Sequence, residues 1–308
     1  MITDFCPVVS VITVNYRSEI ALQRCLASLH SDPLPIEVIV VDNGSVEDKK
    51  NEILSCFPAV TWIEMGRNAG FGRACNAGVT QAHAEKLLFL NPDARVMPQA
   101  LSNLKSVLDQ PEFGDAVIGC AIHNDDGSVQ LSCRRFPTWS AAIANRYSLI
   151  TKLLPRNQFS RAYLMTDFDH ERACRVDWVS GAAMAMNRRV FVRLRGFDDR
   201  YFLYCEDVDI CKRAMALGIQ TWYYPGANVM HSIGGSSRRA MGRALVQRHY
   251  SIWKYYERHH RSRWLDVPVA LFLAGRLVMS LTMLGLYRMK SRRIPHNTFE
   301  KRPARIDS

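Results

Sequence analysis

The sequence has few of the features that mark a secreted, disulfide-stabilised or zinc-binding protein. Its nine cysteines are odd in number and scattered, and no two form a Cys-x-x-Cys pair. This spacing argues against a disulfide framework and against a zinc cluster, and it predicts reduced thiols. The first ten residues also lack the basic segment followed by an apolar segment that a signal peptide has. We therefore expect a cytoplasmic location.

Net charge is almost absent from most of the chain. Residues 1–237 hold 24 Lys and Arg against 25 Asp and Glu, a balance of −1, whereas residues 238–308 hold 16 against 4, a balance of +12. The basic tail could contact nucleic acid, anionic lipid or a phosphate-bearing substrate, or it could be a solvated face. No internal repeat or low-complexity linker divides the 308 residues, and 48% of them are apolar, enough for the core of an α/β enzyme or of two small domains.

Apolar runs alternate with helix-like segments in the first third of the chain. We predict strands over 8–14, 37–41, 60–64 and 86–90, and helices over 19–29 and 73–84. After a middle part of weak periodicity at 116–175, which has a turn at 124–127, we expect an apolar stretch over 178–186, a helix over 208–217 and a strand over 220–224. This alternation predicts an α/β fold with a mainly parallel central sheet and helices on both faces.

Two aspartates directly follow predicted strands of this sheet. Asp42 precedes a turn, Asn43-Gly44-Ser45, and can accept a hydrogen bond from a nucleotide base or ribose. Asp93, after Asn91 and Pro92, can hold Mg²⁺ or Mn²⁺ if substrate phosphates and water supply the other oxygens. Considered alone, Asp42 could instead be a turn or capping residue, and Asp93 would more often be a turn residue.

The segment Asn68 to Asn76 places two glycines before a predicted helix, where backbone N–H groups could face a phosphate. Cys75 stands where the dinucleotide fingerprint requires its third glycine, which disfavours a dehydrogenase.

Three acidic residues, Glu206, Asp207 and Asp209, follow an aromatic run and begin a predicted helix. Carboxylates in a first helical turn can simply stabilise the helix dipole, but a carboxylate that is partly desolvated beside another acid is a candidate general base. His231 follows a further strand and precedes a glycine-rich loop. It can be a structural histidine or a metal ligand.

In their order along the chain, these segments resemble glycosyltransferase family 2, and most closely its bacterial rhamnosyltransferase-like members, over about residues 8–260. The segments that carry the resemblance are Val11-Ile-Thr-Val-Asn15-Tyr16, Val41-Asp42-Asn-Gly-Ser45, Asn68-Ala-Gly-Phe-Gly72, Leu90-Asn-Pro-Asp93, Ser180-Gly-Ala182, Gly196-Phe-Asp-Asp199, Glu206-Asp-Val-Asp209 and His231.

The resemblance implies a GT-A fold at residues 1–237, with a nucleotide-binding half at about 1–115 and an acceptor half at about 116–237, followed by a basic helical extension at 238–308. It also implies inversion at the anomeric carbon of a nucleotide diphosphate sugar. Asp207 would deprotonate the acceptor hydroxyl, while Asp93 and His231 would hold Mg²⁺ or Mn²⁺. Asn91 stands where the family's Asp-x-Asp motif often has its first aspartate.

The remaining residues expected at the site fall into two groups. Those near the nucleotide sugar are Val14, Tyr16 and Asp42 at the base, then Asn68, Gly70, Phe71 and Gly72 at the ribose and diphosphate, together with Arg73 and Asn91. Those on the acceptor side are Trp178, Gly181 and Glu206.

By resemblance we expect dTDP-rhamnose as donor before a UDP-hexose or UDP-galactofuranose, and a saccharide on a polyprenyl diphosphate as acceptor. A nucleotidyltransferase and a nucleic-acid-binding protein are more distant alternatives. We expect no nucleic acid partner because the strand-end carboxylates repel phosphate unless a metal intervenes.

The tail contains an apolar stretch, Trp264 to Tyr287, bounded by Arg261, Arg263, Arg288 and Lys290. Asp266, Pro268 and Arg276 interrupt it and make a plain membrane-spanning helix costly. We expect it to lie on an anionic membrane surface, with a packed core helix and a span as the alternatives. The enzyme would then be peripheral, on the inner face of the cytoplasmic membrane.

Overall fold

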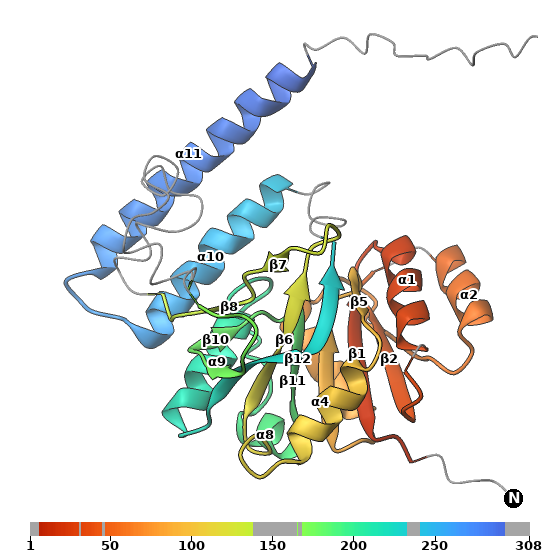
Figure 1. The fold of residues 1–308 in the computed structure, drawn as a ribbon. Helices are drawn as coiled ribbons and strands as arrows, with labels where there is room; N and C mark the ends of the chain where they lie inside the picture. The colour runs from red at the N-terminus through yellow and green to blue at the C-terminus, as the bar shows by residue number, and fades with distance from the viewer. Residues whose placement is uncertain are drawn as a thin grey trace, which may run out of the picture.

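The computed structural model describes residues 6–30, 32–44, 47–137, 165, 168–232 and 241–292. A ten-stranded sheet lies at its centre, in the order β3-β2-β1-β4-β11-β6-β12-β5, with β7 paired to β6 and β9 to β12 (Figure 1). These strands are β1 (Val9–Asn15), β2 (Ile36–Asp42), β3 (Thr61–Glu64), β4 (Lys86–Leu90), β5 (Ala94–Val96), β6 (Val117–His123), β7 (Val129–Gln130), β9 (Cys174–Arg175), β11 (Ala183–Asn187) and β12 (Thr221–His231). A separate two-stranded sheet joins β8 (Cys133–Arg134) to β10 (Trp178–Val179).

Most strands of the central sheet run in one direction. β1 is parallel to β2 and β4, β2 is parallel to β3, and β6 is parallel to β12. β11 is antiparallel to both β4 and β6, so β6 and β12 run the same way as β4. The predicted mainly parallel sheet is therefore confirmed for its longer strands, and the antiparallel strands β11, β5, β7 and β9 make the sheet mixed. The carboxyl ends of β1, β2, β4, β6 and β12 consequently meet at one edge.

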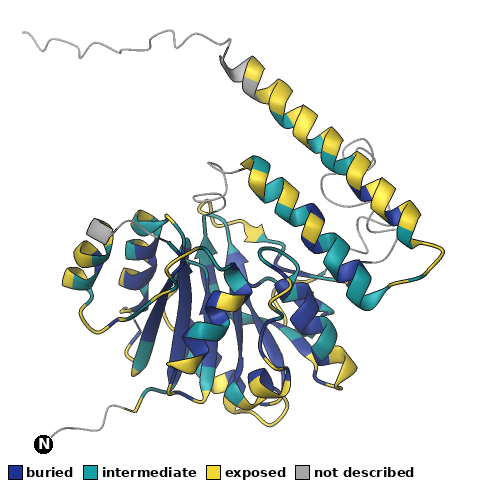
Figure 2. Cartoon of the chain, turned by 180° about the vertical axis from the view of Figure 1, so that it is seen from behind, coloured by how far each residue is buried: buried dark blue, intermediate teal, exposed yellow. Residues whose placement is uncertain are grey.

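Helices cover both faces of this sheet, as the apolar runs predict. One face packs against α3 (Phe71–Thr80), α8 (Arg188–Arg193) and α9 (Glu206–Ala216), and the other against α1 (Glu19–Leu29), α2 (Glu47–Cys56) and α4 (Ala100–Asp109). Successive residues of β1 serve the two faces in turn: Ile12 and Val14 belong to the first core, Val9 and Val11 to the second. Because both faces are buried, the strands read as continuous apolar runs rather than as alternating ones (Figure 2).

The structure corrects two predicted elements. The helix expected over 73–84 begins at Phe71 and ends at Thr80, because the chain then turns and the N–H of Ala84 donates to Ser10 Oγ at 3.1 Å. The apolar stretch 178–186 is not one element but two, β10 and β11. The turn between them, at Ser180 to Ala182, brings Gly181 to the carboxyl-end edge of the sheet.

Two helices follow the sheet, α10 (Met241–His259) and α11 (Asp266–Arg292). α10 packs on the main body, where Tyr255 joins the first core, and α11 packs along α10 and projects away (Figure 1). The domain boundary expected at residue 237 lies outside the described residues.

α11 exposes apolar side chains on most of its surface (Figure 2). Trp264, just before it, is 90% exposed, and Leu271 on it is 68% exposed, whereas Val269 and Leu273 pack against Tyr256. The segment Asp266–Tyr287 is long and apolar enough to cross a membrane by length and composition, and only 11% of its apolar window is buried. A packed core helix, one of the three alternatives, does not fit this exposure. The side chains of Arg288 and Lys290 lie outside the described residues.

Candidate functional site

Asp42 lies at the carboxyl edge of the sheet, as predicted. It is the last residue of β2, in register with Asn15 at the end of β1, and it is 9% exposed. The N–H of Asn43 donates to the carbonyl of Asn15 at 2.8 Å, so the chain continues along the same edge after Asp42.

Asn43, which the sequence reasoning treated only as a turn residue, organises the glycine-containing loop. Its buried amide donates to Asn68 Oδ1 at 3.0 Å and to the carbonyl of Gly70 at 3.2 Å. Its oxygen accepts from the N–H of Ala69 at 2.7 Å. Asn68 in turn accepts from the N–H of Gly70 at 3.1 Å. The loop before α3 is therefore tied to the end of β2 without any ligand.

The two glycines of this loop allow close packing. Gly70 has φ of +92°, and a Cβ there would lie 2.5 Å from the carbonyl oxygen of Phe202. A Cβ on Gly72 would lie 2.9 Å from Phe197 Cβ. The N–H of Phe71, at the start of α3, donates to the Phe202 carbonyl at 2.9 Å. One N–H of this helix terminus is thus occupied by protein, and the predicted contacts of this loop with a ribose and diphosphate stay a prediction.

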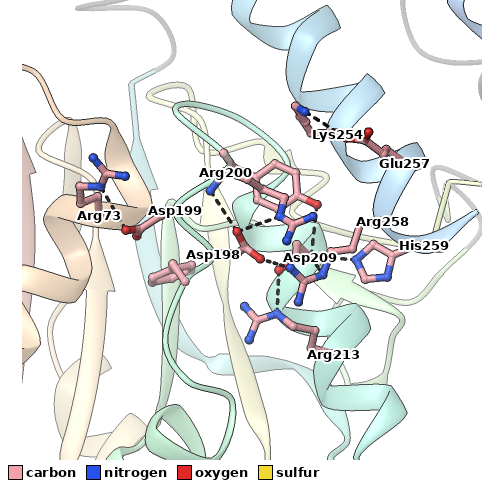
Figure 3. A network of polar contacts seen from close by, with 12 residues as sticks. Arg73, Asp198, Asp199, Arg200, Asp209, Arg213, Lys254, Glu257, Arg258 and His259 are labelled. Carbon is pink, nitrogen blue, oxygen red and sulfur yellow. Dashed lines mark hydrogen bonds and ion pairs between the residues drawn. The ribbon is translucent and has the colours of Figure 1, made fainter. Parts of the chain in front are cut away.

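Three other expected donor-side residues have different surroundings. Val14 is 6% exposed and belongs to the core, so its side chain presents little surface to a ligand. The ring of Tyr16 lies beside Gly44, and Arg17 lies over the same ring at 5.5 Å from its centroid. Arg73 Nε lies 3.2 Å from Asp199 Oδ2 in an exposed ion pair (Figure 3).

His231 and Asp93 face each other at the same edge. His231 ends β12 and Asp93 follows β4, and the antiparallel pairing of β12 with β5 brings His231 Nε2 to 3.1 Å from Asp93 Oδ1. His231 Nδ1 lies 2.9 Å from Gln130 Oε1, and the Gln130 amide nitrogen donates to Asn124 at 2.9 Å, which orients the Gln130 oxygen towards the ring. When His231 is neutral, Nδ1 therefore carries the proton and Nε2 presents a lone pair to the Asp93 carboxylate; when the ring is protonated, Nε2 donates to that carboxylate.

Two acceptors that face each other at this distance suit a shared cation. A histidine whose other ring nitrogen is fixed by a hydrogen bond is the usual form of a metal-ligating imidazole. Asn91 Nδ2 lies 3.5 Å from the same Nε2. Within the described residues, no group of three or more His, Cys, Asp and Glu side chains could hold a metal. A cation at Asp93 and His231 would need further oxygens from a diphosphate and water, as magnesium sites commonly do.

The acidic helix start lies next to this pair. The N–H of Asn91 donates to the carbonyl of Ala182 at 2.9 Å, and the N–H of the preceding Gly181 donates to Asp207 Oδ2 at 3.1 Å. The N–H of Val208 donates to Asp207 Oδ1 at 2.8 Å. Desolvation nevertheless raises the pKa of Asp207 above its usual range. An oriented carboxylate with a raised pKa has the properties of a general base.

Glu206 is buried beside Asp207, on the side of α3. It is 6% exposed, and its Oε2 has no hydrogen-bond partner among the described residues. Burial, followed by the charge of Asp207, raises the pKa of Glu206 from 4.5 to about 8. Glu206 thus holds its proton to a higher pH than an exposed glutamate does.

The backbone just before Glu206 and Asp207 is strained and forms a hydrogen bond with α10. Tyr204 and Cys205 both have φ of 68°, in the left-handed region that residues other than glycine rarely adopt. Ser251 of α10, fully buried, donates its hydroxyl to the carbonyl of Leu203 at 2.7 Å. α10 therefore supports the strained segment that positions the acids.

On the acceptor side, Trp178 is 7% exposed and donates its indole N–H to the carbonyl of Arg135 at 2.8 Å. The guanidinium of Arg134 lies over the Trp178 ring, 5.3 Å from a ring centroid.

Gly181 lies between Phe71 and Asp207, because a Cβ there would be 3.6 Å from the Phe71 ring and 3.5 Å from Asp207 Cβ. Sequence reasoning missed Arg134, which lies in a stretch of weak periodicity with no local signal.

Comparison with known proteins agrees with this geometry. The model of the family "Glycosyl transferase family 2" matches residues 10–191. The chain is 30% identical over 291 residues to an N-acetylglucosaminyl-diphospho-decaprenol L-rhamnosyltransferase of Mycobacterium tuberculosis (strain ATCC 25618 / H37Rv), which covers 90% of this chain and 92% of the relative. It is 26% identical to the rhamnosyltransferase WbbL of Escherichia coli (strain K12), over 81% of this chain and 93% of the relative.

A solved structure with the same fold is a mannosyltransferase from Pyrobaculum calidifontis in complex with GDP-Man and Mn²⁺. It has a TM-score of 0.56 and 16% identity, and the match covers 94% of this chain and 81% of that one. The GT-A fold implied by the sequence is thus confirmed. The family match spans more than half of the chain and includes Asp42, Asp93 and Gly181. The chain belongs to glycosyl transferase family 2 and is a glycosyltransferase.

Proposed function

We propose that this glycosyltransferase moves L-rhamnose from dTDP-rhamnose, with inversion, to a hydroxyl of a saccharide carried on a polyprenyl diphosphate, in the synthesis of a cell-surface polysaccharide. The names of the two rhamnosyltransferases above support the sugar, and the first supports the lipid-linked acceptor. The observation that carries the proposal is the setting of Asp207, a partly buried carboxylate oriented by two backbone N–H groups beside the edge where Asp42 and Asp93 lie.

In this proposal Asp207 accepts the proton of the acceptor hydroxyl. The hydroxyl oxygen then bonds to the anomeric carbon from the face opposite the departing nucleotide diphosphate, which inverts that carbon. The raised pKa of Asp207 strengthens it as a base. While it holds its own proton, Glu206 can donate a hydrogen bond to a sugar hydroxyl without competing for the proton of the acceptor.

Asp93 and His231 are the residues that would hold Mg²⁺ or Mn²⁺, with Asn91 beside them. The cation would supply positive charge to the departing diphosphate. Asp93→Asn should abolish the thermal stabilisation that Mn²⁺ adds to the chain with dTDP, while the stabilisation by dTDP alone persists. An undiminished effect of Mn²⁺ in that variant would remove Asp93 from the metal site.

The apolar helix α11 would place the enzyme on the inner face of the cytoplasmic membrane, near its acceptor. The full chain should float with anionic vesicles and leave them in alkaline carbonate, and a chain without residues 264–308 should stay in solution. Retention in carbonate would indicate a span instead, and a full chain that ignores vesicles would end the membrane proposal.

A thermal-shift screen of nucleotide sugars with Mg²⁺ and Mn²⁺, followed by a transfer assay, tests the donor. We expect the largest stabilisation and transfer with dTDP-rhamnose. A larger response to a UDP-hexose or to UDP-galactofuranose would replace rhamnose, and release of pyrophosphate would indicate a nucleotidyltransferase.

A further inference from the structure

Arg134 is a cation near the proposed base for which the described part of the chain provides no acidic partner. Its Nη2 donates to the carbonyl of Leu131 at a long 3.4 Å, and its buried Nε has no hydrogen-bond partner among the described residues. The neighbouring Arg135, in contrast, pairs with Asp177 at 3.2 Å. Partial burial of an arginine that forms no ion pair and leaves a donor unsatisfied is unfavourable, and an anionic ligand would satisfy it.

The strands place this arginine on the acceptor side of the site. Arg134 on β8 is in register with Trp178 on β10, and β10 leads within three residues to Gly181, whose N–H binds Asp207. The metal-site candidates Asp93 and His231 lie beside Asn91, whose N–H donates to the carbonyl of Ala182. None of these contacts of Asp93 and His231 involves Arg134, so we treat a diphosphate at Arg134 as a different group from the one that Asp93 and His231 would hold.

The separation of Arg134 from Asp207 also matters. The register of β8 with β10 places Arg134 opposite Trp178, three residues before the Gly181 that binds Asp207, and the charge of Arg134 lowers the pKa of Asp207, yet no ion pair joins these two described residues. An anion at Arg134 would thus lie close to the reacting hydroxyl without touching the base. A phosphate attached to the sugar that carries that hydroxyl meets this requirement.

Packing prepares the guanidinium for an anion. The Trp178 ring beneath it restricts the orientation of the guanidinium plane, and a planar arginine can donate two parallel hydrogen bonds to phosphate oxygens. Phe136 is two residues along the chain from Arg134. A second cation, Lys212 of α9, lies over the Phe136 ring, 4.4 Å from its centroid. The described residues give Lys212 no acidic partner either, so the local potential favours an anion.

We infer that Arg134 binds the diphosphate that joins the acceptor sugar to its lipid. This inference rests on the proposed function, because it requires an acceptor of that kind. It assigns to the chain a second diphosphate site, distinct from the one for the nucleotide sugar.

The test compares two acceptors and two adjacent arginines. One acceptor is N-acetylglucosaminyl diphosphate on a short isoprenyl chain, and the other is octyl N-acetylglucosaminide, which has no phosphate. For Arg134→Gln we expect kcat/KM with the diphosphate acceptor to fall about ten- to hundredfold, mainly through KM, because a charged hydrogen bond is lost. With the octyl glycoside kcat/KM should change less than about twofold, and Arg135→Gln, the matched control, should alter neither acceptor by more.

Several results would overturn the inference. An equal loss with both acceptors would mean a structural role, and an unchanged KM for the diphosphate acceptor would exclude binding. A raised KM for dTDP-rhamnose with both acceptors would assign Arg134 to the donor.

If Arg134→Gln does not fold, Arg134→Lys replaces it, because lysine keeps the charge but loses the planar pair of donors. This variant should show a smaller loss of kcat/KM that is restricted to the diphosphate acceptor. An equal loss with both acceptors would again contradict the inference. A wild-type chain that transfers to neither acceptor would remove the proposed function, and the inference with it.

Discussion

His259 Nε2 lies 2.7 Å from Asp209 Oδ1 and joins the C-terminal helix α10 to the helix that carries Glu206 and Asp207 (Figure 3). Asp209 is fully buried, and Arg213 Nε at 2.7 Å and Arg258 Nε at 3.2 Å complete its charged partners. Tyr201 donates its hydroxyl to the same carboxylate at 3.2 Å. α10 is therefore integrated into the catalytic body, and the basic charge of the tail is partly used to satisfy one buried acid.

We predict that Asp209→Asn lowers the free energy of unfolding by about 3 kcal/mol, because it removes a fully buried carboxylate from its partly buried basic partners. Urea unfolding followed by circular dichroism measures this. The matched control is Asp115→Asn, whose ion pair with Arg189 has side chains that are 67% and 65% exposed. The control should cost about 0.5 kcal/mol or less. Equal costs for the two variants would show that the Asp209 cluster contributes no more than a surface pair.

Gly70→Ala should reduce transfer at least tenfold. The new Cβ would lie 2.5 Å from the Phe202 carbonyl and would displace the segment that leads into Glu206 and Asp207. Gly66→Ala is the control, because Gly66 also has a positive φ, +67°, but open space around its Cβ position. That variant should lose about 1 kcal/mol or slightly more of stability and little activity. Comparable activity losses in both would assign the effect to backbone strain and not to the contact with Phe202.

Glu206 should make the protein less stable as pH rises towards 8. Its pKa is raised from 4.5 in an exposed chain to about 8 in the folded protein, so the folded state binds this proton more tightly than the unfolded state. The stability that it contributes is fully present below pH 4.5 and is lost as pH rises through about 8. Glu206→Gln cannot ionise, so its free energy of unfolding should fall less steeply between pH 5 and pH 8.

Glu52→Gln is the control for this experiment. Glu52 is exposed and hydrogen-bonds with Lys49, which lowers the pKa of Glu52, so it stays ionised across that window. Its removal should leave the slope unchanged. A wild-type slope in Glu206→Gln would mean that Glu206 is already ionised at pH 5.

The nucleotide-binding half was largely predictable from sequence because its signals are local. Each buried parallel strand is a short apolar run, and Asp42 is read directly from the residues that precede it. The helix at Glu19–Leu29 and the strand at Lys86–Leu90 have the predicted bounds. α4 was not predicted: its preceding residue, Gln99, has φ of 65° and makes no side-chain capping bond, so the usual start signal is absent.

The rest of the site depends on contacts between distant segments. His259 and Asp209 are 50 residues apart, and Ser251 and Leu203 are 48 apart. Arg134 acquires its position only through the pairing of β8 with β10. None of these relationships has a spacing that periodicity could reveal. The basic tail accordingly suggested a solvated face or contacts with lipid, nucleic acid or a phosphate-bearing substrate, and not a partner for a buried acid.

The catalytic assignment depends on Asp207, and Asp207→Asn tests it most directly. The variant keeps the size of the side chain but cannot accept the proton, so the single-turnover rate of transfer from dTDP-rhamnose should fall about 10²- to 10⁴-fold. Calorimetric titration with dTDP-rhamnose should give an affinity close to that of the wild type, because Asp42 and the Asn68 loop are unchanged. A rate within a few fold of the wild type would contradict the assignment of Asp207 as the base.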